Sequence, residues 1–188
     1  MSALGLLKLA FHHRGSLGRI SRNPAIVEKI TPAYLKSFGA DAVILDHDGI
    51  LGAARSARPD HVGEILLADM VREFGDGKVF ILSNTRSAKS LRTQTYQTSY
   101  PDVVYINSRR KPDPEGLQSA AKICGAPINK IAVVDDGLLT GVLMAVDSGA
   151  IPVYALRERI EETFTTKVMR LGVTMPQLAL VRLFSLFA

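Results

Sequence analysis

Short aliphatic runs alternate with longer amphipathic segments along most of the chain. Five runs are each short enough for a buried strand: residues 42–45, 78–82, 103–106, 131–134 and 151–154. The amphipathic segments between them predict four helices: residues 59–74, 87–96, 113–124 and 138–147. Two closing helices are expected over residues 157–170 and 175–187. Pro152 predicts that the last strand lies at the edge of the sheet.

Continuous apolar strands that alternate with helices are typical of a parallel sheet covered on both faces. The 188 residues suffice for one domain with a sizeable core. The sequence therefore predicts a three-layer, Rossmann-like α/β fold with a mostly parallel sheet and helices on both faces. We expect this domain over residues 31–188, after a basic leader at residues 1–30.

The leader region is the most basic part of a chain whose net charge is +5. Residues 1–40 contain one acid, Glu28, against six cations: Lys8, Arg14, Arg19, Arg22, Lys29 and Lys36. Such a segment attracts an anionic membrane, an anionic substrate or nucleic acid. A solvated arm without a partner is an equally open interpretation. We expect a phosphorylated substrate or a membrane lipid as partner, and no nucleic acid.

Several features bear on the compartment. No apolar run approaches the roughly 20 residues of a membrane-spanning helix. Apolar residues 4–11 precede their cations, the reverse of a secretory signal, so export is not expected. The single cysteine, Cys124, excludes an internal disulfide and suits a reducing compartment. We expect a cytoplasmic protein, with peripheral membrane contact and an organellar transit peptide as open alternatives.

Polar residues come directly after three of the predicted strands and in the loop after a fourth. In chain order they are Asp46, Asp48, Ser83, Asn84, Lys111, Asp135 and Asp136. Ligands of open α/β sheets bind at the carboxyl ends of the strands. We therefore expect these side chains to meet at one edge of the sheet.

These residue types suit phosphoryl transfer from a monoester, which needs an in-line nucleophile, a proton donor for the leaving alkoxide and positive charge around the phosphoryl oxygens. Asp46 is the expected nucleophile and would become an aspartyl-phosphate. Asp48 would act as general acid and then activate water. Lys111 and the Ser83 hydroxyl would hold the phosphoryl oxygens.

A magnesium ion is the expected cofactor, because Mg²⁺ prefers oxygen ligands and keeps several waters. The expected ligands are Asp46, Asp136 and the backbone carbonyl of Asp48, with Asp135 as an additional candidate. The ion would also let neighbouring carboxylates stay ionised at neutral pH.

Each motif alone has a simpler interpretation. Residues 46–49 favour a turn, and residues 83–85 are typical of a helix N-cap. Asp135 and Asp136 suit the cap of the following helix, and Lys111 suits a solvated basic loop. Their order along the chain favours catalysis or phosphate binding. His47 is expected to point away from the site, because neighbouring side chains alternate in direction at a strand end.

The stretch Leu45-Asp46-His47-Asp48-Gly49-Ile50-Leu51 resembles the first motif of the haloacid dehalogenase (HAD) superfamily of phosphatases. The second to fourth motifs are similar to Leu82-Ser83-Asn84, Lys111-Pro112 and Val134-Asp135-Asp136-Gly137. Within the superfamily, residues 30–35 and 136–143 resemble the YqeG-like phosphatases of subfamily IIIA, which are related to mitochondrial phosphatidylglycerophosphate phosphatases. The resemblance implies a HAD fold and the roles given above, including Asn84 as a phosphate-binding residue.

Three positions depart from the family pattern. Ile50 stands in place of Thr, Asp135 in place of Gly, and Gly141 in place of an acid that supports the metal. Gly141 implies weaker Mg²⁺ binding or slower turnover unless Asp135 compensates.

The spacing of the motifs leaves no room for a substantial cap domain, since one helix and its loops fill each gap. By resemblance, capless members act on large or membrane-held substrates. Residues 4–11 and 178–187 are apolar enough for a lipid interface, burial in the core or a subunit contact in a homo-oligomer. A phospholipid phosphomonoester such as phosphatidylglycerophosphate is therefore the candidate substrate. The alternatives are a soluble small-molecule phosphatase and a catalytically weakened HAD domain that serves as a binding or regulatory module.

Overall fold

The computed structural model describes residues 1–54, 56–84, 91–106, 110–158 and 164–187. Its strands are β1 (Ala25–Ile26), β2 (Ala42–Leu45), β3 (Val79–Leu82), β4 (Val104–Ile106), β5 (Ile131–Asp135) and β6 (Ile151–Leu156). Its helices are α1 (Ala3–His12), α2 (Arg14–Arg22), α3 (Pro32–Ser37), α4 (His61–Phe74), α5 (Leu91–Ser99), α6 (Glu115–Cys124), α7 (Gly141–Ser148) and α8 (Phe164–Ser185). Two 3-10 turns, η1 (Val27–Lys29) and η2 (Ile128–Lys130), complete the described elements.

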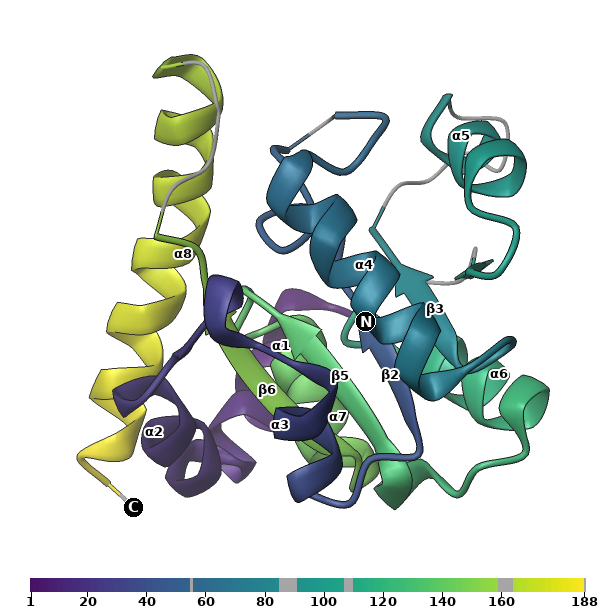
Figure 1. Ribbon diagram of the computed structural model, residues 1–188. Coiled ribbons are helices and arrows are strands. Elements are labelled where there is room, and N and C mark those ends of the chain that lie inside the picture. Colours follow the sequence, from purple (N-terminus) through teal and green to yellow (C-terminus); the bar gives the residue numbers. More distant parts are fainter. Residues whose placement is uncertain (55, 85–90, 107–109, 159–163, 188) are drawn as a thin grey trace.

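The six strands form one parallel sheet in the order β1-β6-β5-β2-β3-β4 (Figure 1). Alternate residues of β2 face opposite sides: Val43 and Leu45 pack with α4, and Ala42 and Ile44 pack with α6 and α7. A helical layer therefore covers each face, and the predicted three-layer α/β architecture is confirmed. The β2–β3 connection holds α4, and the described part of the β3–β4 connection holds α5.

The N-terminal segment is not a solvated arm, so that interpretation was wrong. Ala10 and Leu17 are fully buried in a core cluster with α7 and α8, and β1 adds a strand to the sheet beside β6. Gly18 lets α2 lie close to α8, since a Cβ there would be 2.7 Å from the Cβ of Ser185. Residues 1–30 are thus packed onto the domain at the β6 side of the sheet (Figure 1).

Two other details differ from the sequence prediction. The C-terminal part is one helix, α8, which continues through Pro176 rather than breaking before it. Strand β6 lies between β5 and β1, but β1 pairs only with Ala155 and Leu156. Among the described residues, no strand pairs with Pro152 on the β1 side of β6. The missing N–H of Pro152 therefore removes no sheet hydrogen bond on that side. Residues 87–90 of a predicted helix and 159–163 of another lie outside the described residues.

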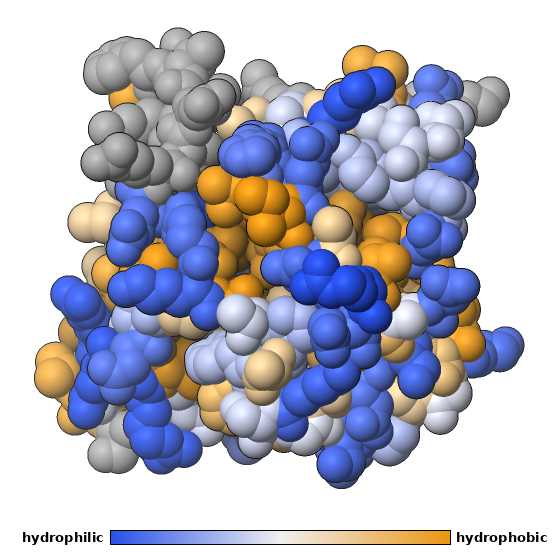
Figure 2. Space-filling view, in the orientation of Figure 1, coloured by the Kyte–Doolittle hydropathy of each residue, from blue (hydrophilic) through white to orange (hydrophobic). Residues whose placement is uncertain are grey.

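The face of the molecule that carries α3 and α4 combines hydrophilic side chains with hydrophobic patches between them (Figure 2). No helix among the described residues combines the length and apolar character needed to cross a membrane.

Candidate active site

Three carboxylates meet at the carboxyl ends of β2 and β5. These neighbouring strands pair in parallel with Leu45 opposite Val134, and the Asp46 N–H donates to the Val134 carbonyl at 2.9 Å. One carboxylate oxygen from each of Asp46, Asp135 and Asp136 lies within 4.8 Å of the other two. The strand register therefore brings together the acids that the sequence places at separate strand ends.

Lys111 is buried among these acids. Its side chain is 2% exposed, and its Nζ lies 3.0 Å from Asp46 Oδ1 and 2.5 Å from Asp135 Oδ2. The Lys111 backbone N–H donates to Asn84 Oδ1 at 2.9 Å, so the second and third motifs hold each other. Lys111 is therefore not the solvated loop residue that its basic neighbours suggest.

The turn after Asp46 depends on Gly49. Gly49 has φ +84°, in the left-handed region that favours glycine, and a Cβ there would be 2.1 Å from Asp136 Oδ2. The turn is closed by the N–H groups of Leu51 and Gly52, which both donate to the His47 carbonyl at 3.0 Å. Any side chain at position 49 would displace the Asp136 carboxylate from the acidic cluster.

A cavity of about 270 Å³ opens beside the cluster. Of the predicted site residues, Asp46, Asp48, Asn84 and Asp136 line it. Ser83, Lys111 and Asp135 do not; they are buried around it. Thr174 and Gln177 of α8 form part of the wall, and Gln177 Oε1 accepts a hydrogen bond from the Leu139 N–H at 3.0 Å. No pattern in the sequence indicates that the C-terminal helix reaches the site.

Arg92 on α5 is the main site residue that sequence reasoning missed. Its guanidinium is 5% exposed and forks onto Asp48, with 2.7 Å from Nη2 to Oδ1 and 3.2 Å from Nη1 to Oδ2. Nη1 also donates to Ser83 Oγ at 2.8 Å, and Nε donates to the Ser56 carbonyl at 2.9 Å. Arg92 thus connects the first motif to the second.

His47 points away from the cavity, as predicted. It is fully buried, with 2.8 Å from Nδ1 to Tyr96 Oη and from Nε2 to Ser56 Oγ. Burial, reinforced by the nearby Arg92 cation, lowers the pKa of His47 to about 4. The imidazole is therefore neutral at pH 7 and has a structural part in the turn.

The electrostatics of the acidic cluster favour positive charge beside the three carboxylates. Burial raises the pKa of Asp46 to about 7; Lys111 opposes the shift, and Asp135 and Asp48 add to it. Burial, together with Asp135 and Asp46, also raises the pKa of Asp136 well above its usual range. Burial alone would lower the pKa of Lys111, but the Asp135 and Asp46 carboxylates outweigh it and raise that pKa. Lys111 is thus a cation beside three acids.

The donor set fits a hard divalent ion. All three carboxylates offer oxygen atoms, and Asp46 and Asp136 border a cavity with room for water ligands. Both oxygens of Asp135 already have partners: Oδ2 contacts Lys111, and Oδ1 accepts from the Gly137 N–H at 2.7 Å and Thr140 Oγ1 at 3.1 Å. We infer that Asp46 and Asp136 would be the main side-chain ligands of Mg²⁺, with Asp135 anchoring Lys111.

The glycine at position 141 has a steric explanation. A Cβ on Gly141 would lie 2.1 Å from Asp135 Oδ2. The Asp135 carboxylate therefore occupies the space that a side chain at 141 would need. An acid at position 135 and a side chain at position 141 therefore exclude each other in this arrangement.

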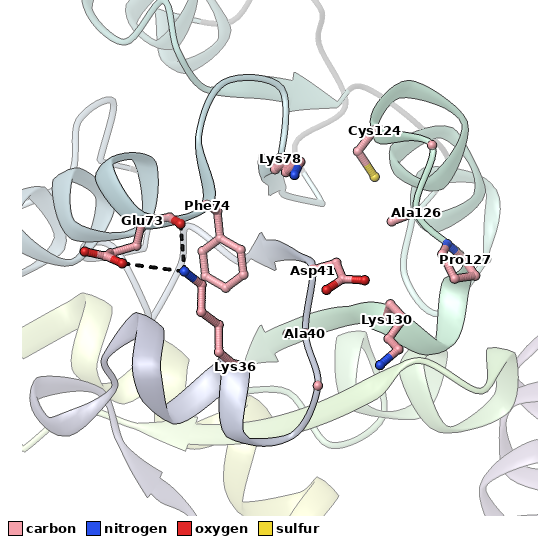
Figure 3. Close-up of a pocket in the computed structure, with 12 residues that line it drawn as sticks. Lys36, Ala40, Asp41, Glu73, Phe74, Lys78, Cys124, Ala126, Pro127 and Lys130 are labelled. Carbon is pink, nitrogen blue, oxygen red and sulfur yellow. Dashed lines mark hydrogen bonds and ion pairs between the residues drawn. The ribbon is translucent and has the colours of Figure 1, made fainter.

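A second and larger cavity, of about 610 Å³, lies at the opposite edge of the sheet (Figure 3). Its lining includes Asp41, Lys78 and Lys130, which directly precede β2, β3 and β5. Lys36, also in the lining, contacts the Glu73 carboxylate at 3.5 Å and donates to the Glu73 carbonyl at 2.8 Å. None of the predicted site residues lines this cavity, and we assign the chemistry to the smaller one.

Comparison with known proteins leaves the function open. No family model matches the chain, and no curated protein matches it. An uncharacterized protein from Corynebacterium glutamicum, solved by crystallography, is similar to it with 21% identity and a TM-score of 0.47. The alignment covers 73% of this chain and 96% of that one.

Reciprocal substitution can test the steric conflict between the Asp135 carboxylate and a side chain at position 141. Asp135→Gly should destabilise the metal-free protein by about 3 kcal/mol, because it removes a partner of a buried ammonium. Gly141→Asp should also destabilise it, by about 1–3 kcal/mol, through overlap with Asp135. The double variant should recover stability, since an acid at 141 would reach Lys111 once Asp135 is gone. Urea unfolding in EDTA measures all three; a double variant as unstable as the sum of the singles would contradict this account.

The stability of the metal-free protein should fall as pH rises from about 4 to about 7. The pKa of Asp46 is about 7 in the folded protein against an ordinary 3.8, so the folded state binds this proton more tightly than the unfolded chain. The resulting stability is complete below the ordinary pKa and is lost as pH rises through the folded one, by up to about 1.4 kcal/mol per pH unit. Urea unfolding in EDTA measures this slope. Asp46→Asn should make it shallower, and an unchanged slope in that variant would show that Asp46 is not its source.

Proposed function

We propose that this protein is a Mg²⁺-dependent phosphomonoester hydrolase of the HAD class, similar to the YqeG-like phosphatases, that works through an aspartyl-phosphate intermediate. The main support is the convergence of Asp46, Asp136 and the buried Lys111–Asp135 pair beside one cavity. A turn or helix-cap function would explain any one of these residues, but it does not explain why an ammonium is buried among acids from two strands.

The nucleophile in this proposal is Asp46 Oδ2. The other oxygen, Oδ1, already accepts from the His47 N–H at 2.8 Å and contacts Lys111 Nζ. Oδ2 would attack phosphorus and form the acyl-phosphate bond while the bond from phosphorus to the ester oxygen breaks. Asp48, which borders the cavity, would give its proton to the departing alkoxide.

The second half of the reaction returns the enzyme to its first state. Asp48, now a carboxylate, would take a proton from water as the water oxygen attacks phosphorus. The bond from Asp46 Oδ2 to phosphorus breaks, inorganic phosphate leaves, and Asp48 keeps the proton for the next cycle. The net reaction is a phosphomonoester plus water giving an alcohol plus phosphate.

The remaining groups would manage charge and position. Asp46, Asp136 and the Asp48 carbonyl would hold Mg²⁺, which supplies positive charge at the phosphoryl oxygens when bound. Lys111 and the Ser83 hydroxyl would donate hydrogen bonds to the same phosphoryl oxygens. Asn84 offers its amide NH₂ to the same oxygens, because its carbonyl is already taken by the Lys111 N–H.

Arg92 would couple substrate binding to the proton transfer. In the free protein its fork contacts both oxygens of the Asp48 carboxyl group, so this group does not face a leaving group. Phosphoryl oxygens compete well for a guanidinium fork. A substrate phosphoryl group beside Ser83 would therefore draw Arg92 away from Asp48, so that Asp48 can turn toward the leaving group and carry the proton.

The candidate substrate is a phospholipid phosphomonoester such as phosphatidylglycerophosphate, handled by a cytoplasmic enzyme peripheral to a membrane. A soluble small-molecule monoester is the alternative within the same chemistry. Asp135 fills the space at position 141, but both of its oxygens already have partners. A catalytically weakened domain that serves as a binding or regulatory module is therefore the alternative from a different class, and the activity screen below tests it.

The proposal predicts Mg²⁺-dependent release of phosphate that Asp46→Asn abolishes, because an amide cannot form the acyl-phosphate. A screen with an aryl phosphate, soluble monoesters and phosphatidylglycerophosphate, in Mg²⁺ and in EDTA, measures this and ranks the substrates. Asp69→Asn, on the exposed face of α4, is the matched control and should keep full activity. A folded wild-type protein inactive on all of these substrates would refute the proposal.

Arg92→Met should lower kcat/KM by about tenfold or more, since charge-assisted fork contacts are lost. Arg92→Lys should restore only part of it, because an ammonium cannot make the planar fork. Steady-state kinetics across the pH range would separate a positioning role from a structural one, because loss of the Asp48 contact should change the shape of the pH profile. Arg72→Met, exposed on α4, is the control. Equal rates and profiles for wild type and Arg92→Met would remove Arg92 from the mechanism.

A further inference from the structure

Helix α1 presents an apolar stripe to the surface. Leu4, Leu7 and Phe11 are 62%, 39% and 43% exposed. Their i, i+3, i+7 spacing places them on one side of the helix. The other side of α1 packs into the core through Ala10, with Leu6 and Leu9 half-buried against the same cluster. The stripe is therefore not the packing face of α1.

The end of α8 and the two residues that follow it present a second apolar group next to the first. Leu183, Leu186 and Phe187 are 52%, 77% and 64% exposed. The stripe and this group meet where the rings of Phe11 and Phe184 pack edge to face, with centroids 5.3 Å apart.

Arg14 strengthens this junction. Its Nε donates to the Phe187 carbonyl at 2.9 Å, and its guanidinium lies 4.6 Å from the centre of the Phe11 ring. We call Leu4, Leu7, Phe11, Leu183, Leu186 and Phe187 together the α1–α8 surface.

The two chain segments that carry this surface hold charge of one sign, although Asp147 of α7 lies beside His13. Residues 1–27 and 164–188 contain no Asp or Glu. They do contain seven cations: Lys8, Arg14, Arg19, Arg22, Lys167, Arg170 and Arg182. The rest of the chain holds more acids than cations, so the net charge of +5 comes from these two segments.

We propose that the α1–α8 surface docks onto an anionic membrane. Leu and Phe side chains on amphipathic helices insert into the headgroup boundary, and nearby Lys and Arg each add about 1 kcal/mol of attraction to anionic lipid. A second copy of this chain is a poor occupant, because the two cationic rims would face each other. A nucleic acid would match the charge but would leave the exposed Leu and Phe side chains in water.

The surface and the candidate active site share one helix. Thr174 and Gln177 of α8 line the cavity, and Leu183 lies nine residues after Thr174, about 14 Å further along the axis. Docking through the end of α8 would thus hold the wall of the cavity that α8 forms about 14 Å along the helix axis from the docked residues. The docking itself goes beyond the proposed hydrolysis and is testable without it.

Co-sedimentation with vesicles tests the proposal on the full chain. Wild type should bind vesicles of phosphatidylcholine mixed with phosphatidylglycerol, and not phosphatidylcholine alone, and added salt should weaken binding. The pairs Leu4→Ser with Leu7→Ser, and Leu186→Ser with Phe187→Ser, should each lower the partition coefficient by roughly tenfold or more. Ile65→Ser with Ile123→Ser, at exposed apolar positions on α4 and α6, is the control and should bind as wild type does.

Three outcomes would overturn the proposal. One is no binding of wild type to the anionic vesicles. Another is binding that both Ser pairs leave unchanged. The third is a dimer in analytical ultracentrifugation that the same pairs dissociate, which would give the surface to a second copy. Asp46→Asn should bind vesicles normally, so a failure of docking and a failure of catalysis can be told apart.

Discussion

The arrangement of the site depends on one buried cation. Lys111 Nζ lies between Asp46 and Asp135, with almost none of its side chain in water. Burial of charged groups costs several kcal/mol each, and such pairs seldom add net stability. An apolar trio of the same volume would serve folding as well. The interaction is better explained by what it fixes: an ammonium held against the carboxylate that we propose as nucleophile, ready before any substrate arrives.

The sheet makes this contact possible. Asp46 and Asp135 are far apart in sequence, and they meet because β5 pairs directly with β2 in a register that puts Leu45 opposite Val134. A one-residue slip would turn the acids to the other face. The close turn at Gly49 then lets Asp136 approach from the same side. Strand order, register and one glycine together convert three separate acids into a single cluster of negative charge.

The hydrophobic pattern is sufficient to predict strands β2 to β6 and the polar residues at their ends, because both follow from local periodicity. It did not predict β1, whose two residues are too few for a periodic signal. It could not predict Arg92, whose contacts with Asp48 and Ser83 join elements distant in sequence. Nor could it predict that α8 passes unbroken through Pro176 to form a wall of the cavity, since packing against α2 outweighs the local cost of proline. Net charge suggested a free leader because the charges are visible in the sequence and the buried Leu17 contact is not.

Asp135 and Gly141 show why a motif is better compared in three dimensions than residue by residue along the chain. Read along the chain, Gly141 looks like a loss that weakens a metal site. In three dimensions the Asp135 carboxylate occupies the volume of the missing side chain, and contact with Lys111 gives it a function there. Asp135 then requires a glycine at position 141, because the Asp135 carboxylate and a side chain at 141 cannot occupy the same space. If the proposed HAD resemblance holds, the two departures count as one change.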